Sequence, residues 1–151
     1  MRKSVTLAAA LLAAVLSPIR LYAQTPRDVL LTQLEYSATL KQMEGFKLDG
    51  EALPRNVVIG ALPNEGTIVL ELSLSAGATY FIVGVCDEDC DDMDMSLLDP
   101  VDGEALAEDS EDDSVPLLEF VAPRTGEYYL SVTMYDCRTS YCFFGLQVMR
   151  K

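Results

Sequence analysis

Residues 117–135 read LLEFVAPRTGEYYLSVTMY, and this stretch decides the fold class. Residues 117–121 and 130–135 have the composition and alternation of two β-strands, with Pro123 and Gly126 as turn residues between them. In the second strand the apolar side chains alternate with side chains that face the wetter side: Leu130, Val132 and Met134 alternate with Ser131, Thr133 and Tyr135. We therefore predict two strands joined by a tight turn.

The same period of two, broken by Gly, Pro and Asn, continues on both sides of this stretch. Further predicted strands cover residues 56–59, 68–75, 79–86, 93–98, 105–107 and 144–149. The run at 79–86 is almost continuously apolar, which favours a central strand. About eight strands predict an all-β protein with a jelly-roll-like antiparallel β-sandwich.

One helix is predicted ahead of the strands. Thr25 can act as N-cap, Pro26 suits the first helical position, and the negative charge of Asp28 interacts favourably with the helix dipole. We expect an amphipathic helix at about 27–44, ended by Gly45, whose apolar stripe forms a lid on the protein's own core. That stripe contains Leu30, Leu34 and Ala38.

The first residues have the pattern of a secretory signal peptide. A basic start at Met1-Arg2-Lys3 precedes an apolar run at 5–16, and Ala23 is a small residue at the expected cleavage point before Gln24. The alternative is a membrane anchor, but the run is shorter than the ~20 residues that span a bilayer. We expect a periplasmic or extracellular protein with no membrane insertion after cleavage. The expected organisation is a signal peptide at 1–23, a helix at 24–45 and a β-sandwich at 46–151.

The protein is strongly acidic. The whole chain has a formal net charge of −13, and residues 24–151 keep all 24 acidic side chains but only eight basic ones, a net charge of −16. Nucleic acids and anionic membranes bind to positive patches, so neither is expected as a partner.

The four cysteines form two close pairs, Cys86 with Cys90 and Cys137 with Cys142. An even number of cysteines fits an oxidising compartment, and we favour two local disulfides because each pair flanks a short polar loop. The competing interpretation is a single zinc site, which needs thiolates kept reduced outside the cytoplasm. Short loops limit the entropic gain, so the bridges are expected to shape loops more than to raise stability.

Fourteen of the 24 acidic residues lie between Asp87 and Asp113, with no Lys or Arg among them. Carboxylates at this density are the oxygen ligands that calcium prefers. The candidate calcium ligands are Asp87, Asp89, Asp91, Asp92 and Asp94. The pattern departs from an EF-hand loop, because Asp92 stands where glycine is needed and Leu98 where a bidentate glutamate belongs. The alternative is a solvated acidic rim, the usual meaning of a charge run.

Three segments carry a resemblance to a known family: residues 92–103 (DMDMSLLDPVDG), 107–109 (AED) and 120–132 (FVAPRTGEYYLSV). They resemble the bacterial pre-peptidase C-terminal domain. The resemblance implies a jelly-roll-like β-sandwich that serves exported enzymes as a non-catalytic accessory or binding module, and some relatives bind calcium. This chain departs from the family in lacking a protease domain and in having the cysteine pairs and the N-terminal helix.

No catalytic residues are predicted. The chain has no histidine, which removes the commonest general base and the Ser-His and Cys-His pairs. We expect a binding module whose partner is an exported protein or a polysaccharide. One alternative is a structural or interaction protein whose acidic loops only solubilise it. Another is a carboxylate-based hydrolase, disfavoured because a raised pKa needs an apolar pocket and these acids lie in polar runs.

Overall fold

The computed structural model describes residues 24–53 and 56–151. The predicted signal peptide lies outside the described residues. The chain forms the elements α1 (Pro26–Met43), β1 (Lys47–Leu48), β2 (Val57–Leu62), β3 (Gly66–Leu74), β4 (Thr79–Cys86), β5 (Cys90–Leu98), β6 (Ala105–Asp109), β7 (Leu117–Val121), β8 (Gly126–Cys137) and β9 (Cys142–Arg150). No helix among the described residues is long and apolar enough to cross a membrane.

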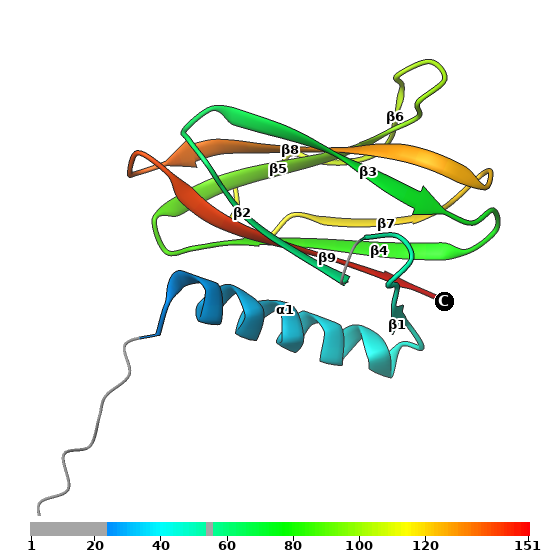
Figure 1. Cartoon of the computed structure of the whole chain (residues 1–151), viewed down its shortest axis with the longest axis horizontal. Coiled ribbons are helices and arrows are strands. Elements are labelled where there is room, and N and C mark those ends of the chain that lie inside the picture. Colours follow the sequence, from blue (N-terminus) through cyan, green and yellow to red (C-terminus); the bar gives the residue numbers. More distant parts are fainter. Residues whose placement is uncertain (1–23, 54–55) are drawn as a thin grey trace, which may run out of the picture.

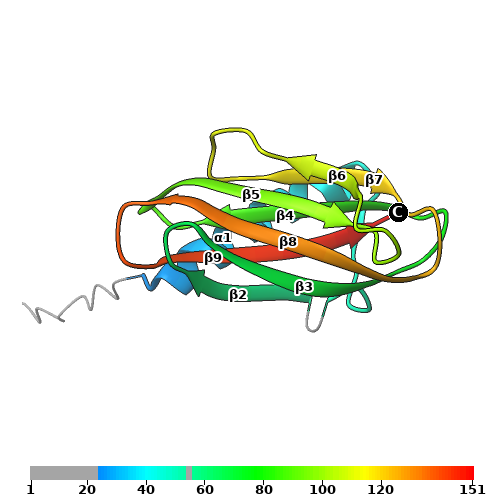
Figure 2. The same cartoon turned by 90° about the horizontal axis from the view of Figure 1, so that it is seen from above.

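The strands form two antiparallel sheets that pack face to face (Figures 1 and 2). Sheet A has the order β1-β9-β4-β7, with β2 also paired to β9, and sheet B has the order β3-β8-β5-β6. From β2 to β9 the chain changes sheet at every connection except β5–β6. This is jelly-roll topology, so the predicted fold class is confirmed.

The main core lies between the two sheets and consists of inward-facing residues at every second position. On β9, for example, Phe144, Leu146 and Val148 are buried in this core, and on β5 Met93, Met95 and Leu97 meet them from the other sheet. The predicted alternation of β3, β5, β8 and β9 is therefore what fills the sandwich.

A second core lies on the outer face of sheet A, under α1. Leu30, Leu34 and Ala38 are buried there against Phe81, Val83, Val85 and Met149. The helix is held at its start by a capping box between Thr25 and Asp28. The apolar stripe thus covers the protein's own sheet, as predicted. Both faces of β4 are buried, which explains its continuous apolar run.

Several strands differ from their predicted bounds. β5 begins at Cys90 rather than at 93, and β8 begins at Gly126 rather than at 130. The reason is that backbone pairing continues past the alternating apolar residues: Cys90 pairs with Cys137, and Gly126 pairs with Leu74. Polar residues extend a strand when a neighbouring strand supplies the hydrogen bonds.

Replacing a helix residue in the second core tests this packing. Leu34 is 1% exposed and Leu40 is 46% exposed. We expect Leu34→Ala to lower the free energy of unfolding by about 2 to 5 kcal/mol, through lost burial and the cavity left behind. The matched variant Leu40→Ala should change it by less than about 0.5 kcal/mol. Chemical denaturation measures both, and equal effects would show that α1 does not cover the sheet.

Candidate functional site

Two disulfides lie next to each other at one end of the sandwich. Cys86 and Cys90 join the end of β4 to the start of β5, with a Cα–Cα distance of 5.9 Å. Cys137 and Cys142 join β8 to β9 in the same way, at 5.8 Å. Cys90 and Cys137 are also partners across sheet B. The predicted pairing is confirmed, and each bridge also connects one sheet to the other.

Other connections meet the disulfides at this end (Figure 1). The β2–β3 turn contributes Asn64, whose Oδ1 accepts a hydrogen bond from the Cys137 N–H at 2.7 Å. The β6–β7 loop contributes the Ser114 carbonyl, which accepts from the Cys86 N–H at 3.2 Å. We call the acidic residues gathered here the acidic end: Asp87, Glu88, Asp89, Asp91, Asp92, Glu111, Asp112, Asp113 and Asp136.

Asp87 fixes the β4–β5 turn to the neighbouring strand. Its N–H donates to the Phe143 carbonyl at 3.0 Å, and its Oδ2 accepts from the Phe143 N–H at 3.0 Å. The other carboxylate oxygen of Asp87 is buried without a partner among the described residues. This residue therefore serves the framework of the turn, and it presents little of its charge to a ligand.

Arg138 connects the same turn to the β8–β9 loop. Its Nε lies 3.2 Å from Asp91 Oδ2, and its N–H donates to the Asp89 carbonyl at 2.9 Å. Its Nη2 also donates to the Glu88 carbonyl. With its backbone bonded on both sides, the turn is fixed, and the carboxylates of Glu88 and Asp89 are left to project from it.

Asp92 and Asp94 lie on β5 in a different setting. Asp92 is only 9% exposed and its Oδ1 has no hydrogen-bond partner among the described residues. Burial raises the pKa of Asp92, and the nearby carboxylates of Asp94, Asp112, Asp113 and Asp136 raise it further. Burial likewise raises the pKa of Asp94, with Asp109, Glu108 and Asp112 adding to the shift. The raised pKa of Asp92 therefore arises without an apolar pocket, because the side chain is enclosed where β5 pairs with β8 and its neighbours are other carboxylates.

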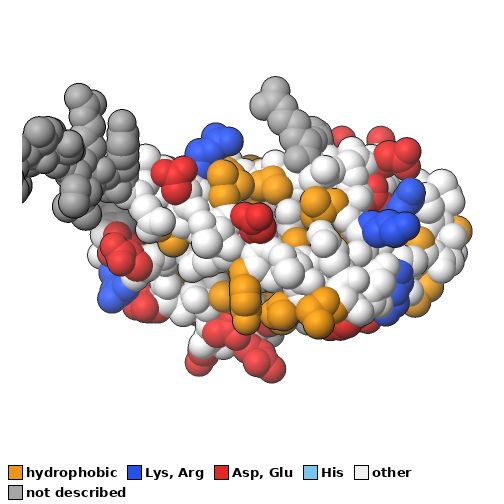
Figure 3. Space-filling model, turned by 90° about the horizontal axis from the view of Figure 1, so that it is seen from below, with side chains coloured by type: hydrophobic (Ala, Val, Ile, Leu, Met, Phe, Trp, Pro, Cys, Tyr) orange, Lys and Arg blue, Asp and Glu red, His pale blue; other side chains and the backbone are white. Residues whose placement is uncertain are grey.

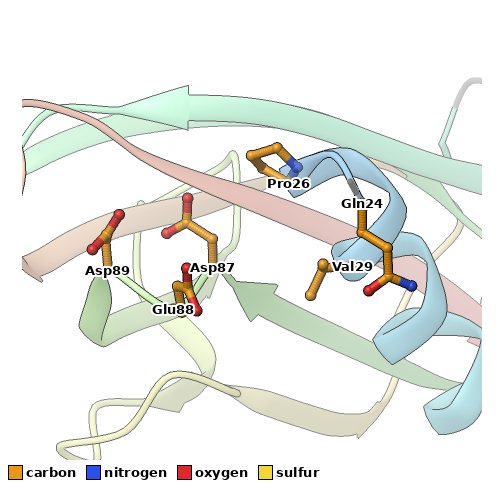
Figure 4. A pocket seen from close by; sticks show the side chains of 6 residues that line it. All are labelled: Gln24, Pro26, Val29, Asp87, Glu88 and Asp89. Atoms are coloured by element: carbon orange, nitrogen blue, oxygen red, sulfur yellow. The ribbon is translucent and has the colours of Figure 1, made fainter. Parts of the chain in front are cut away.

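The structure separates the five predicted calcium ligands into three places. Asp87 and Asp89 line a hollow of about 310 Å³ together with Glu88 and with Gln24, Pro26 and Val29 at the start of α1 (Figure 4). Asp91 pairs with Arg138 at the start of β5. Asp92 and Asp94 lie further along the same strand. In the part of the chain that the structure describes, no three acidic side chains are arranged to hold a metal ion.

Exposed aromatic residues flank the second disulfide, and the sequence reasoning missed them. Tyr135 and Tyr141 are each 61% exposed, and Phe143 is 41% exposed. Their proximity in sequence to Cys137 and Cys142 was a signal, since a bridge holds the residues beside it near the end of the sandwich. Aromatic side chains at a charged surface are typical of protein-binding sites.

The buried charge of Asp92 predicts a measurable pH dependence. Because its folded-state pKa is raised, the native state binds a proton more tightly than the unfolded chain, and stability is lost as the pH rises through the folded pKa. We expect Asp92→Asn to raise the free energy of unfolding at pH 7 by about 1 kcal/mol. The variant should also lose less stability than the wild type as the pH rises. Urea denaturation from pH 4 to 8 measures this, with Glu88→Gln as an exposed control. Destabilisation of Asp92→Asn at neutral pH would contradict the assignment.

No family model and no curated protein matches the sequence. Among solved structures, the chain is similar to PliG of Aeromonas hydrophila, a periplasmic inhibitor of g-type lysozyme, with 19% identity and a TM-score of 0.48 over 63% of this chain and 84% of that one. It is also similar to the pre-peptidase C-terminal domain of a Bacillus anthracis collagenase, with 23% identity and a TM-score of 0.49 over 61% of this chain and 86% of that one. The second structure belongs to the family that the sequence segments resemble, and at these identities the likeness concerns the β-sandwich fold alone.

Proposed function

We propose that this protein is an exported, non-catalytic binding module whose acidic end binds a basic surface of another exported protein. The observation that carries the proposal is the gathering of exposed carboxylates and exposed aromatic side chains around two disulfides. The alternative of a polysaccharide partner uses the aromatic residues but not the charge. A net charge of −16 over residues 24–151 therefore favours a basic protein.

The rigidity of the acidic end supports binding. The two disulfides and the Arg138 contacts hold Glu88 and Asp89 in place before any partner arrives, so less conformational entropy is lost on association. Clustered charge of one sign raises the rate of encounter with a partner of the other sign. Tyr135, Tyr141 and Phe143 supply the apolar contact area that charged residues cannot.

Export is part of the same proposal. Disulfides persist in oxidising compartments, and the sequence starts with the pattern of a cleaved signal peptide. The periplasm and the extracellular space both fit. The proposed organisation remains a signal peptide at 1–23, a helix at 24–45 and a β-sandwich at 46–151.

The geometry also supports a non-catalytic role. A pair of carboxylates can act as acid and base only when a substrate reaches both. Asp92 has a raised pKa but is 9% exposed and faces other carboxylates, so its carboxyl group is not presented to a substrate.

Binding to a basic protein tests the proposal. Lysozyme, a small basic secreted protein, serves as the probe in calorimetry on residues 24–151 with the disulfides formed. We expect saturable binding that weakens as salt is raised, and we expect the double variant Glu88→Gln/Asp89→Asn to weaken it by about tenfold or more. Tyr141→Ala should also weaken it, with little change in the salt dependence.

The matched control removes the same charge from the opposite end of the sandwich. Asp102 and Glu104 lie in the β5–β6 connection, and Asp99 of that connection pairs with Arg124 near the β7–β8 turn at 2.7 Å. The variant Asp102→Asn/Glu104→Gln should bind as the wild type does. If both double variants weaken binding equally, the net charge and not the acidic end is responsible, and the proposal fails.

Calcium binding is a second candidate function, favoured by the buried, unpaired Oδ1 of Asp92 amid other carboxylates. Because no three of the described acidic side chains are arranged to hold an ion, such a site requires the carboxylates near Asp92, among them Asp112, Asp113 and Asp136, to move toward it. We expect millimolar calcium to raise the melting temperature by mass action, more than magnesium does, and to lose this effect in Asp92→Asn. Equal shifts with both ions, or with the variant, would indicate charge screening and exclude the site.

A further inference from the structure

The strand β2 forms an unprotected edge of sheet A. Its only strand partner among the described residues is β9, and it lies at the outer margin of the molecule (Figure 2). Proteins usually guard such edges with charged residues or proline. The other outer strands each carry a charged residue: Lys47 on β1, Glu71 on β3, Glu108 and Asp109 on β6, and Glu119 on β7. The sequence of β2, VVIGAL, has no charge and no proline.

A groove with both apolar and polar walls runs beside this edge, between β2 and α1. Two adjoining hollows of about 490 and 480 Å³ share Leu31 and Val57 in their walls. Further apolar walls come from α1, β1 and β2: Leu34, Ala38, Leu48, Val58 and Ile59. The polar lining comes mostly from the helix: Arg27, Glu35, Thr39 and Gln42. Apolar side chains reach the surface on this helix-bearing face (Figure 3). A strand added to β2 would therefore place alternate side chains beside the apolar residues Leu31, Val57 and Ile59.

Gln147 provides a polar group within the groove. It lies opposite Val57 on β9, is 4% exposed and lines the larger hollow. Its Oε1 is buried and has no hydrogen-bond partner among the described residues. A buried acceptor without a partner is costly to the folded protein. A ligand that donates a hydrogen bond there would remove that cost.

We infer that β2 binds an extended peptide segment of another protein, which adds to sheet A as a new edge strand and donates a hydrogen bond to Gln147. The main chain of the segment pairs with the free groups of β2, and alternate apolar side chains enter the groove. The segment carries Lys or Arg at its ends, because residues 24–151 have a net charge of −16. Two copies of this chain would repel each other because both are negatively charged, which disfavours a second copy as the strand that pairs with β2. The inference uses a surface apart from the acidic end and does not depend on it.

A short synthetic peptide tests the inference. The probe is KVTVTVTK with a fluorescent label, and its control is the same peptide with N-methyl groups on alternate residues, which cannot complete the strand pairing. We expect saturable binding of the probe, binding weaker by about tenfold or more for the methylated control, and slower hydrogen exchange of alternate β2 amides when the probe is bound. Unchanged exchange in β2 at saturation would overturn the inference.

Variants of the protein locate the site. Val57→Glu puts a charge into the groove, and Gln147→Met removes the unpaired acceptor while keeping the side-chain volume. Both variants should weaken binding of the probe. The matched variant Val121→Glu lies on β7, at the opposite edge of the same sheet, and should not weaken it. Equal weakening by Val57→Glu and Val121→Glu would place binding elsewhere. If sedimentation shows a dimer that Val57→Glu converts to a monomer, a second copy occupies the edge, and the peptide inference is wrong.

Discussion

The burial of the two central strands of sheet A on both faces is the constraint on which the rest of the structure depends. β4 and β9 form the centre of this sheet, with sheet B on one side and α1 on the other. Because the side chains of β4 and β9 are buried on both faces of the sheet, these strands are apolar along most of their length. Charged residues therefore lie at the strand ends and in the loops. The acidic end and the apolar residues of the groove beside β2 both follow from this division. Gln147 is the exception, since it is a polar residue of β9 enclosed under the helix.

Repulsion among carboxylates at the acidic end is opposed by the framework beneath it. Two disulfides, the Asp87 contacts with Phe143 and the Arg138 contacts with the β4–β5 turn hold the loops against each other. The repulsion is evident at Asp92, whose carboxylate is enclosed among other acids and whose pKa is raised. A surface that keeps such repulsion in the folded state is suited to a partner of opposite charge. That property links the fold to the proposed function.

Much of the fold could be predicted from local pattern. Period-two alternation identified the strands, Thr25 and Pro26 marked the start of α1, and the spacing of the cysteines gave their pairing. The candidate site was less predictable, because its geometry arises from contacts between distant residues. The burial of Asp92 depends on β8 and on the β6–β7 loop, and the role of Asp87 depends on Phe143. The free edge of β2 follows from the order of the strands in the sheet, and this order cannot be read from the residue pattern of a single strand.

The central claim is that the disulfide-held acidic end is the binding surface. Amide chemical-shift mapping of isotope-labelled protein during titration with a basic exported protein tests it most directly. The account predicts that the largest shifts cluster at residues 87–92 and 135–143 and disappear when the disulfides are reduced under conditions that keep the sandwich folded. Shifts centred on residues 99–104 at the other end, or spread evenly over the surface, would contradict it.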